Sequence, residues 1–250
     1  MSEKISIKSL IEVGAHFGHQ TMRWNPKMKP YIFGKRGDIH IIDLKKTLVA
    51  LDETYAFVRE ICAAGKTVLF VGTKKQAQEA IADAANRCGM PYVNARWLGG
   101  FLTNFETIRK RVNYMEKLEA EEADGSAALY TKKEQILRKK ELIKLQTNLN
   151  GIRNMDRVPD AIFVIDTNRE AIAVAEAKRL GVPIIGTIDT NCDPDDITLG
   201  IPSNDDSIGS VKLLCDFIAD AVLAGTQAVI SPEEMMGQPE EKSDEKTDVA

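Results

Sequence analysis

The stretch AIFVIDTNREAIAVAEAKRLGVPIIG (161–186) decides the fold, because it reads as strand, helix and strand in succession. Its apolar runs, 161–165 and 182–186, are continuous rather than alternating, as in parallel strands that are covered on both faces. Between them, residues 169–180 are rich in Ala, Glu, Lys and Arg, and Gly181 stands where a helix C-cap is expected. The stretch therefore predicts a crossover unit of a parallel sheet.

The same unit occurs earlier in the chain. Residues 68–71 (VLFV) are a continuous apolar run, 74–88 form a helical pattern, and Gly89 and Pro91 end it. A last helix is expected over about 207–224, ended by Gly225. We therefore expect an α/β domain with a parallel sheet, made of residues 1–103 and 158–228.

Residues 104–157 interrupt this pattern as an insertion. Apolar side chains recur there at spacings of three and four, along two segments: Phe105, Ile108, Val112, Met115 and Leu118, then Leu142, Leu145, Leu149 and Ile152. A turn signal at 124–126 separates them, and Thr131 with Glu134 forms a capping-box start for the second helix. Such narrow stripes predict a protruding antiparallel coiled-coil hairpin that packs mainly against itself.

Charge is distributed unevenly along the 250 residues, whose net charge is -4. Residues 1–46 hold nine Lys/Arg against four Asp/Glu, and 104–157 hold twelve against nine, whereas 187–250 hold three against fifteen. Basic surfaces are therefore compatible with an acidic total. The acidic tail, 229–250, is expected to be disordered.

Several classes of protein are not indicated. There is no apolar run long enough for a membrane span and no signal-peptide pattern, so we expect a cytoplasmic protein without membrane contact. The four cysteines lack Cys-x-x-Cys spacing and are expected to be reduced and buried. No nucleophile motif is present, and His16 and His19 lack the H-E-x-x-H form. We therefore predict that the protein is not an enzyme.

A nucleotide-binding enzyme remains the main alternative. Residues 71–75 (VGTKK) follow a strand and open a helix, which is where α/β folds hold phosphates. This interpretation places a nucleotide near Gly72 and Lys74, but both glycine-rich fingerprints are missing.

Acidic residues gather after the later strands. Asp189, Asp193 and Asp205 are candidates for a structural Mg²⁺ or Zn²⁺ ion, while no cofactor is expected to be required. Their spacing matches no metal-binding loop, so a solvated or capping role stays open.

Three segments combine cations with aromatic side chains or helical periodicity. Mixtures of this kind bind RNA through ion pairs with phosphates and stacking on bases. The candidate RNA-binding residues are Trp24, Lys27, Lys29, Arg96, Arg109, Lys110, Lys132, Lys133 and Lys139. Simple solvation of a lysine-rich helix face is the alternative for each segment alone.

The chain resembles the bacterial small-subunit ribosomal protein S2 family. The resemblance is carried by residues 10–47 (LIEVGAHFGHQTMRWNPKMKPYIFGKRGDIHIIDLKKT), 68–81 (VLFVGTKKQAQEAI), 96–111 (RWLGGFLTNFETIRKR), 158–195 and 201–214 (IPSNDDSIGSVKLL). It implies a flavodoxin-like or Rossmann-like parallel sheet with an inserted coiled-coil hairpin. The long hairpin, 104–157, is similar to that of the bacterial members.

The resemblance also implies a function. Such a protein would be a structural, ribosome-bound constituent of the small subunit, in contact with small-subunit rRNA and neighbouring ribosomal proteins. It would help to recruit the mRNA-binding ribosomal protein S1, would not be a homo-oligomer, and would carry a metal ion near Asp189, Asp193 and Asp205. A protein-interaction module that uses the hairpin as a docking arm is a further hypothesis, compatible with the first.

Overall fold

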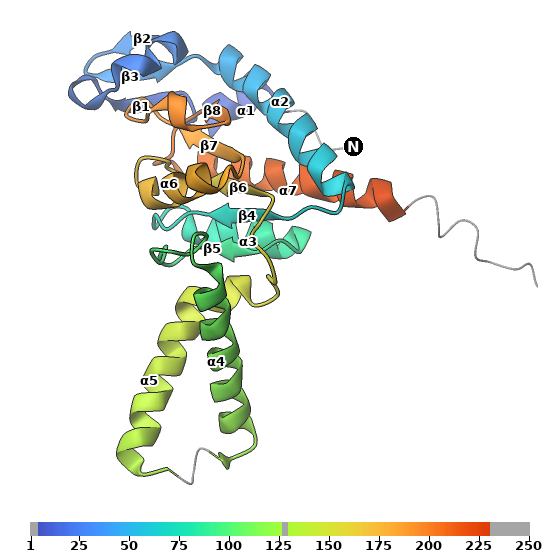
Figure 1. The fold of residues 1–250 in the computed structure, drawn as a ribbon. Coiled ribbons are helices and arrows are strands. Elements are labelled where there is room, and N and C mark those ends of the chain that lie inside the picture. The colour runs from blue at the N-terminus through green and yellow to red at the C-terminus, as the bar shows by residue number, and fades with distance from the viewer. Residues whose placement is uncertain (1–4, 127–129, 231–250) are drawn as a thin grey trace, which may run out of the picture.

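The computed structural model describes residues 5–126 and 130–230, with side chains up to residue 227. Three parts follow one another in space (Figure 1): a small antiparallel sheet, an α/β body, and a pair of helices that extends away from the body. The acidic tail beyond residue 230 lies outside the described residues. None of the described helices is long and apolar enough to span a bilayer.

The body is built on a five-stranded parallel sheet in the order β5-β4-β6-β7-β8. Its strands are β4 (Val68–Val71), β5 (Tyr92–Val93), β6 (Ala161–Val164), β7 (Ile184–Ile188) and β8 (Leu199–Pro202). Numbered along the chain this is the 2-1-3-4-5 order of flavodoxin-like folds, whose crevice opens between β4 and β6. The predicted parallel α/β fold is confirmed.

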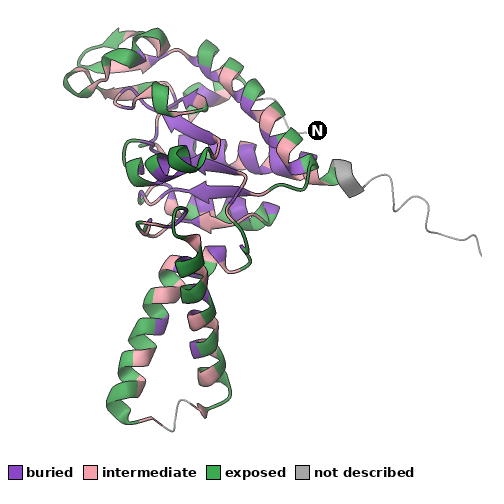
Figure 2. Ribbon diagram, viewed as in Figure 1, coloured by how far each residue is buried: buried purple, intermediate pink, exposed green. Residues whose placement is uncertain are grey.

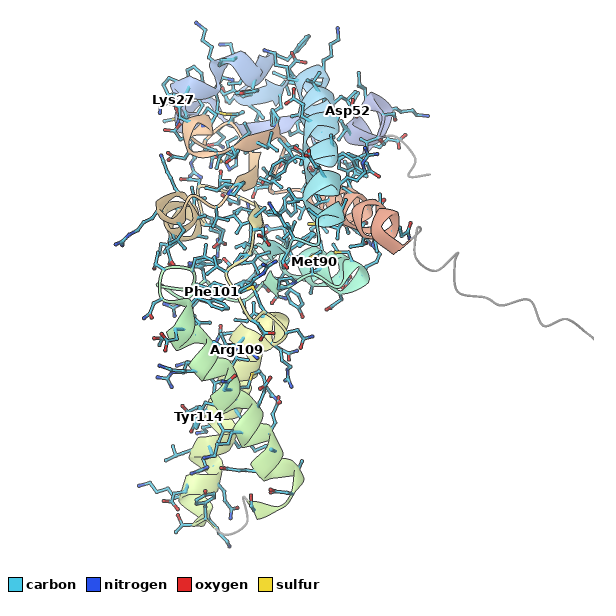
Figure 3. All side chains as sticks on the ribbon, turned by 45° about the vertical axis from the view of Figure 1, so that its right-hand side comes forward. Lys27, Asp52, Met90, Phe101, Arg109 and Tyr114 are labelled. Atoms are coloured by element: carbon cyan, nitrogen blue, oxygen red, sulfur yellow. The ribbon has the colours of Figure 1, made fainter. Side chains whose placement is uncertain are left out.

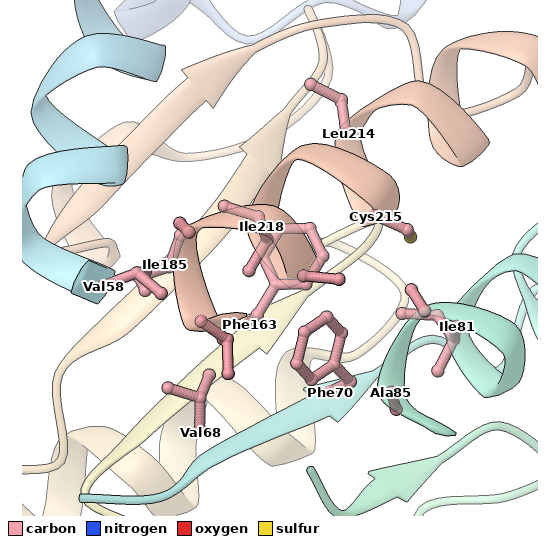
Figure 4. Close-up of a cluster of buried hydrophobic side chains, with 14 of the residues drawn as sticks. Val58, Val68, Phe70, Ile81, Ala85, Phe163, Ile185, Leu214, Cys215 and Ile218 are labelled. Atoms are coloured by element: carbon pink, nitrogen blue, oxygen red, sulfur yellow. The ribbon is translucent and has the colours of Figure 1, made fainter. Parts of the chain in front are cut away.

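Every residue of β4, β6 and β7 is buried, because both faces of the sheet are covered. Phe70 and Phe163 lie on the face covered by α2 (Leu44–Ala63), α3 (Gln78–Cys88) and α7 (Ile208–Ile230), with ring centroids 5.5 Å apart (Figure 4). Leu69 and Ile162 face the other way, toward α6 (Ala171–Leu180) and the 97–102 loop. Two apolar cores therefore sandwich one sheet.

The final helix, α7, is longer than the sequence predicts. α7 runs through Gly225 to Ile230 instead of ending near residue 224. A Cβ atom at Gly225 would lie 2.6 Å from Arg59 O and 2.8 Å from Cys62 Cβ in α2. This glycine lets two helices approach closely and is not a cap, a distinction that needs the partner helix.

The N-terminal part folds as a small sheet, which the sequence pattern does not predict. After α1 (Ile7–Glu12), the strands β1 (Phe17–Gln20), β2 (Ile32–Arg36) and β3 (Ile39–Ile42) pair antiparallel in the order β1-β3-β2. Two 3-10 helices, Thr21–Arg23 and Pro26–Tyr31, join β1 to β2. A Cβ atom on Gly18 would lie 2.5 Å from Thr190 Cγ2, so the small sheet lies directly against the loop after β7.

The insertion folds as the two expected helices, α4 (Phe105–Ala123) and α5 (Lys132–Leu149), followed by a 3-10 turn, η4 (Asn150–Ile152). Arg138 Nη1 lies 2.5 Å from Glu121 Oε2, and Gln146 Nε2 donates to Glu119 Oε1 at 2.7 Å, so the helices contact each other. The buried stripe of Ile108, Val112, Met115, Leu118, Leu142 and Leu149 joins the core of the 97–102 loop and the sheet.

The apolar stripe is thus continuous with the core of the body. That the pair packs mainly against itself stays a prediction. Beyond that base, exposed residues dominate both helices (Figure 2). Coiled-coil packing of the pair stays a prediction.

Candidate RNA-binding surfaces and the strand-end crevice

The crevice at the carboxyl ends of β4 and β6 is filled by the protein's own side chains. Thr73 donates its backbone N–H (3.0 Å) and its hydroxyl (2.5 Å) to Glu170 Oε1. A carboxylate therefore occupies the place where phosphate-binding α/β proteins hold their anion. A Cβ on Gly72 would lie 3.0 Å from Ile81 Cγ1, so this glycine serves helix packing instead of a close approach by a ligand.

Lys74 turns inward beside the crevice. Its Nζ lies 2.6 Å from Asp206 Oδ1, 2.7 Å from Asp205 Oδ1 and 3.2 Å from Asp166 Oδ2, and the residue is 8% exposed. Burial alone would lower the pKa of Lys74, but hydrogen bonds to Asp205 and Asp206 raise it above the ordinary value. The ammonium group is thus a permanent internal cation and is not offered to a nucleotide.

Asp166 adopts a conformation that is rare for an L-residue, with φ of +61°. Its backbone N–H donates to Thr187 Oγ1 at 2.9 Å, and its Oδ1 accepts from Arg169 N at 3.0 Å. These contacts on both sides hold the left-handed backbone that carries the carboxylate toward Lys74.

Two further carboxylate contacts come from the small sheet. His19 Nδ1 lies 3.1 Å from Asp189 Oδ1 and its Nε2 lies 3.4 Å from Asp206 Oδ2. The close carboxylate of Asp189 raises the pKa of His19 despite burial, and the neighbouring Asp205 and Asp206 act in the same direction. This histidine links the N-terminal sheet to the ends of β7 and β8.

The resulting strand-end cluster (Lys74, Asp166, Asp189, Asp205, Asp206 and His19) holds more negative than positive charge. Burial, with the nearby Asp189 and Asp166, raises the pKa of Asp205 to about 7. Its Oδ2 is buried without a hydrogen-bond partner within the described chain. The ligand atoms of His19, Asp205 and Asp206 all lie within 4.8 Å of one another, as do those of Asp166, Cys192 and Asp205.

Of the predicted metal ligands, the structure brings Asp189 and Asp205 together and leaves Asp193 apart. Asp193 Oδ2 lies 2.7 Å from Lys27 Nζ, at the surface, and this ion pair lowers the pKa of Asp193. Sequence order alone could not separate them, because both Asp189 and Asp193 follow β7 within five residues.

The N-terminal RNA-binding candidates differ in their surroundings. Lys27 Nζ is held between Asp193 and Asp195, 2.7 Å from each, and the hydrogen bonds to them raise its pKa. The Trp24 ring packs 5.1 Å from His40 and is partly buried. Lys29 is exposed, and no carboxylate in residues 5–126 or 130–227 pairs with it.

The hairpin candidates divide in the same way. Arg109 donates to Arg153 O at 2.5 Å and pairs with Asp156 at 3.1 Å, while Lys110 pairs with Glu106 at 2.8 Å. Lys139 lies 3.9 Å from Glu122, a looser pair.

Lys132, Lys133 and Arg96 are exposed and have no carboxylate partner among the side chains described. Both lysines occupy the first turn of α5, where the helix dipole disfavours positive charge. Figure 3 shows Arg109 on the helix pair and Lys27 at the opposite end of the molecule.

Glu176, which is not among the candidates that the sequence offers, organises the loop before the helix pair. Its carboxylate is 7% exposed and accepts hydrogen bonds from Trp97 Nε1, Thr103 Oγ1 and three backbone N–H groups, those of Gly100, Leu102 and Thr103. A glutamate in the middle of the Ala-rich 169–180 pattern looks like an ordinary exposed helix residue, so no signal in the sequence pointed to it.

These features define a class of protein: an α/β body of flavodoxin-like strand order, with a strand-end crevice closed from within and unpaired cations on its appendages. Comparison with protein families identifies the particular family. Residues 10–225 match the family described as Ribosomal protein S2, and the chain belongs to that family. Its role is therefore that of a structural constituent of the small ribosomal subunit, associated with rRNA and other ribosomal proteins.

Proposed function

We propose that the protein binds small-subunit rRNA directly, with the tip of the helix pair as its main contact. The observation that carries the proposal is the pair Lys132 and Lys133, exposed and unpaired within the described residues, in the first turn of α5. Two cations at the N-terminus of a helix oppose the helix dipole, so they do not stabilise α5. RNA phosphates would supply the missing counter-charge.

The remaining candidates then fall into two roles. Arg96 and Lys29 are free to contact phosphate, as is Lys139, whose pairing with Glu122 at 3.9 Å is easily exchanged. Arg109, Lys110 and Lys27 are engaged with the protein and would position the surfaces that carry them. Trp24, packed on His40, is expected to support the small sheet and to offer one ring face to RNA.

We further propose that the small sheet and α1 recruit ribosomal protein S1. A cavity of about 300 Å³ is lined there by Ile7, Ile11, His16, Phe33 and Ile41, among others. Phe33 is 78% exposed and Ile11 51%, so the patch is apolar and open. Open apolar patches of this kind mark protein-docking surfaces.

The strand-end cluster fits a structural Mg²⁺ or Zn²⁺ ion, although no cofactor is required for the proposed role. His19, Asp189, Asp205 and Asp206 would hold the ion, with Asp205 Oδ2 as the buried oxygen that lacks a partner. The ion would neutralise the excess negative charge and join the small sheet to the body. Asp193, being held by Lys27, would not take part.

A structural rather than enzymatic role agrees with the closed crevice, because Glu170 and Lys74 occupy the position expected for a nucleotide. We propose a bacterial type of protein, on the strength of the helix pair, that acts on cytoplasmic ribosomes and is not a homo-oligomer. Light scattering on the purified chain checks the last point: a dimer at micromolar concentration would contradict it.

The rRNA proposal is tested by reversing charge at the tip. Lys132, Lys133 and Lys139 are replaced together by Glu, and occupancy of the variant on reconstituted small subunits is measured by sedimentation. A matched control reverses three exposed lysines of the body and α1: Lys8, Lys75 and Lys212. The tip variant is expected to lose occupancy while the control keeps it. Full occupancy of the tip variant would contradict the assignment.

A further inference from the structure

A cavity of about 560 Å³ lies at the amino ends of β4 and β5, opposite to the strand-end crevice. Lys66 and Thr67 precede β4 on one side, Met90 and Pro91 precede β5, and residues 150–157 at the foot of the helix pair close the other side. Figure 3 places Met90 just above the base of that pair. The volume falls in the range of small-ligand sites.

The wall of the cavity is held in place by close packing. A Cβ atom on Gly151 would lie 2.3 Å from Tyr92 O and 2.8 Å from the Tyr92 ring, so only glycine lets η4 lie directly on β5. Arg153 is fixed from behind, because its Nη2 donates to Glu119 Oε1 at 2.8 Å and to Asn150 Oδ1 at 3.1 Å. These contacts set the position of η4 and of Arg153 in the wall of the cavity.

The charged side chains of the lining are mostly positive. The lining holds three cations, Lys66, Arg153 and Arg157, and one carboxylate, Asp156, which pairs with Arg109 at 3.1 Å. Lys66 is exposed and has no carboxylate partner within the part of the chain that the structure describes. The pairing of Arg157 with Asp160, at 3.3 Å, leaves 67% of the Arg157 side chain exposed. The rim can therefore accept an anion such as a phosphate group.

Polar and apolar groups suited to a flat heterocycle line the same cavity. The side-chain amides of Asn86 and Asn154 have no hydrogen-bond partner among the described residues. Met90, Tyr92 and Met155 add apolar surface. Amides pair with the edges of bases, and aromatic and apolar side chains pack on their faces.

From these three properties together we infer that the cavity binds one nucleotide unit, with the phosphate at Lys66 and Arg157 and the base between the amides and Met90. An inorganic anion would use the cations but not the amides or the apolar wall, and an apolar ligand would leave the cations unused. The nucleotide can be an unstacked residue of rRNA or a free mononucleotide. In its rRNA form the inference rests on the proposed function.

The free form is tested on the full-length protein with ¹³C-labelled methionine methyl groups. AMP, UMP and inorganic phosphate are titrated separately while the Met90 and Met155 signals are followed. Saturable shifts with a mononucleotide and none with phosphate support the inference. The double variant Lys66→Ala, Arg157→Ala is expected to weaken this binding about tenfold. The matched control Lys75→Ala, Arg179→Ala, two exposed cations elsewhere, should bind as the wild type does. An equal response to phosphate alone would mean a simple anion site and would overturn the inference.

The rRNA form is tested in small subunits that contain 4-thiouridine-substituted rRNA. Cross-links from the rRNA to Met90 or Tyr92, located by mass spectrometry, would identify rRNA as the source of the nucleotide. If the protein occupies the subunits fully, but neither these cross-links nor shifts with mononucleotides occur, the inference is wrong and the proposed function stands. If the wild-type protein does not join small subunits at all, it is the proposed function that fails.

Discussion

Replacement of Glu176 by Gln should destabilise the protein and loosen the root of the helix pair. The carboxylate receives five hydrogen bonds of 2.8 to 3.1 Å from the 97–103 loop. A glutamine has one acceptor oxygen, and its NH₂ group would point at donors. Either Trp97 Nε1 and Gly100 N, or Leu102 N with the Thr103 groups, would then lose their acceptor.

The magnitude follows from the buried donors. Each donor left without an acceptor costs about 1–3 kcal/mol, and at least two are affected, for a gross loss of about 2–6 kcal/mol. Gln also relieves the desolvation of a buried charge, which offsets part of this loss. We expect the free energy of unfolding to fall by about 2–4 kcal/mol, a large share of the 5–15 kcal/mol typical of a domain.

Urea denaturation measures the global loss, and amide hydrogen exchange at Gly100, Leu102 and Thr103 measures the local one. Glu106→Gln is the control, because Glu106 is an exposed residue whose ion pair with Lys110 lies on the surface and adds little to stability. A Glu176→Gln variant within about 0.5 kcal/mol of the wild type, with unchanged exchange, would refute the reasoning.

The same residue has a pH signature. Burial would raise the pKa of Glu176, but hydrogen bonds from Thr103, Trp97, Gly100 and Leu102 prevail and lower it below its ordinary 4.5. For a carboxyl with a lowered pKa, the stabilisation is complete above the ordinary pKa and is lost as the pH falls through the lowered one. Glu176→Gln should therefore flatten the acid limb of the stability curve below about pH 4.5.

Three other predictions concern helix packing, phosphate binding and the strand-end cluster. Gly225→Ala should lower the free energy of unfolding by about 1–3 kcal/mol by crowding Arg59 O, although Gly to Ala usually stabilises a helix interior; a gain in thermal denaturation would contradict the packing. Lys132→Ala with Lys133→Ala should reduce the salt dependence of small-subunit binding, with the slope of log K against log salt falling by about 0.7–0.9 for each phosphate that is no longer neutralised; an unchanged slope would speak against ion pairs between these lysines and phosphates. Mg²⁺ or Zn²⁺ at a hundredfold excess over Kd should stabilise the wild type by about 2.7 kcal/mol and Asp205→Asn much less, as seen by calorimetric melting; equal stabilisation of both would exclude the cluster as the site.

The sequence pattern was sufficient for the parallel character of the sheet, for its strands β4, β6 and β7, and for the two helices of the insertion. Continuous apolar runs such as 161–165 and spacings of three and four such as Ile108, Val112 and Met115 are local signals, because each reflects which face of its own element is buried. The small sheet escaped detection because β1, β2 and β3 are mostly exposed or half-buried and carry no such run. The sequence was enough to name Lys132 and Lys133 as candidate RNA-binding residues. It could not show that they lack carboxylate partners among the described residues.

Pairing across the chain depends on tertiary structure. In the sequence Lys74 is a candidate for holding a nucleotide, yet it is buried against Asp205 because the parallel strands bring their carboxyl ends to one edge. Asp189 and Asp193 look alike in the chain, but one lies in that buried cluster and the other pairs with Lys27 at the surface. Glu176 and Gly225 likewise gain their roles from segments 73 and more than 160 residues away. The type of a residue limits the interactions that its side chain can make. Which partners it has, and hence its charge state and its function, depends on the tertiary contacts between segments that are distant in sequence.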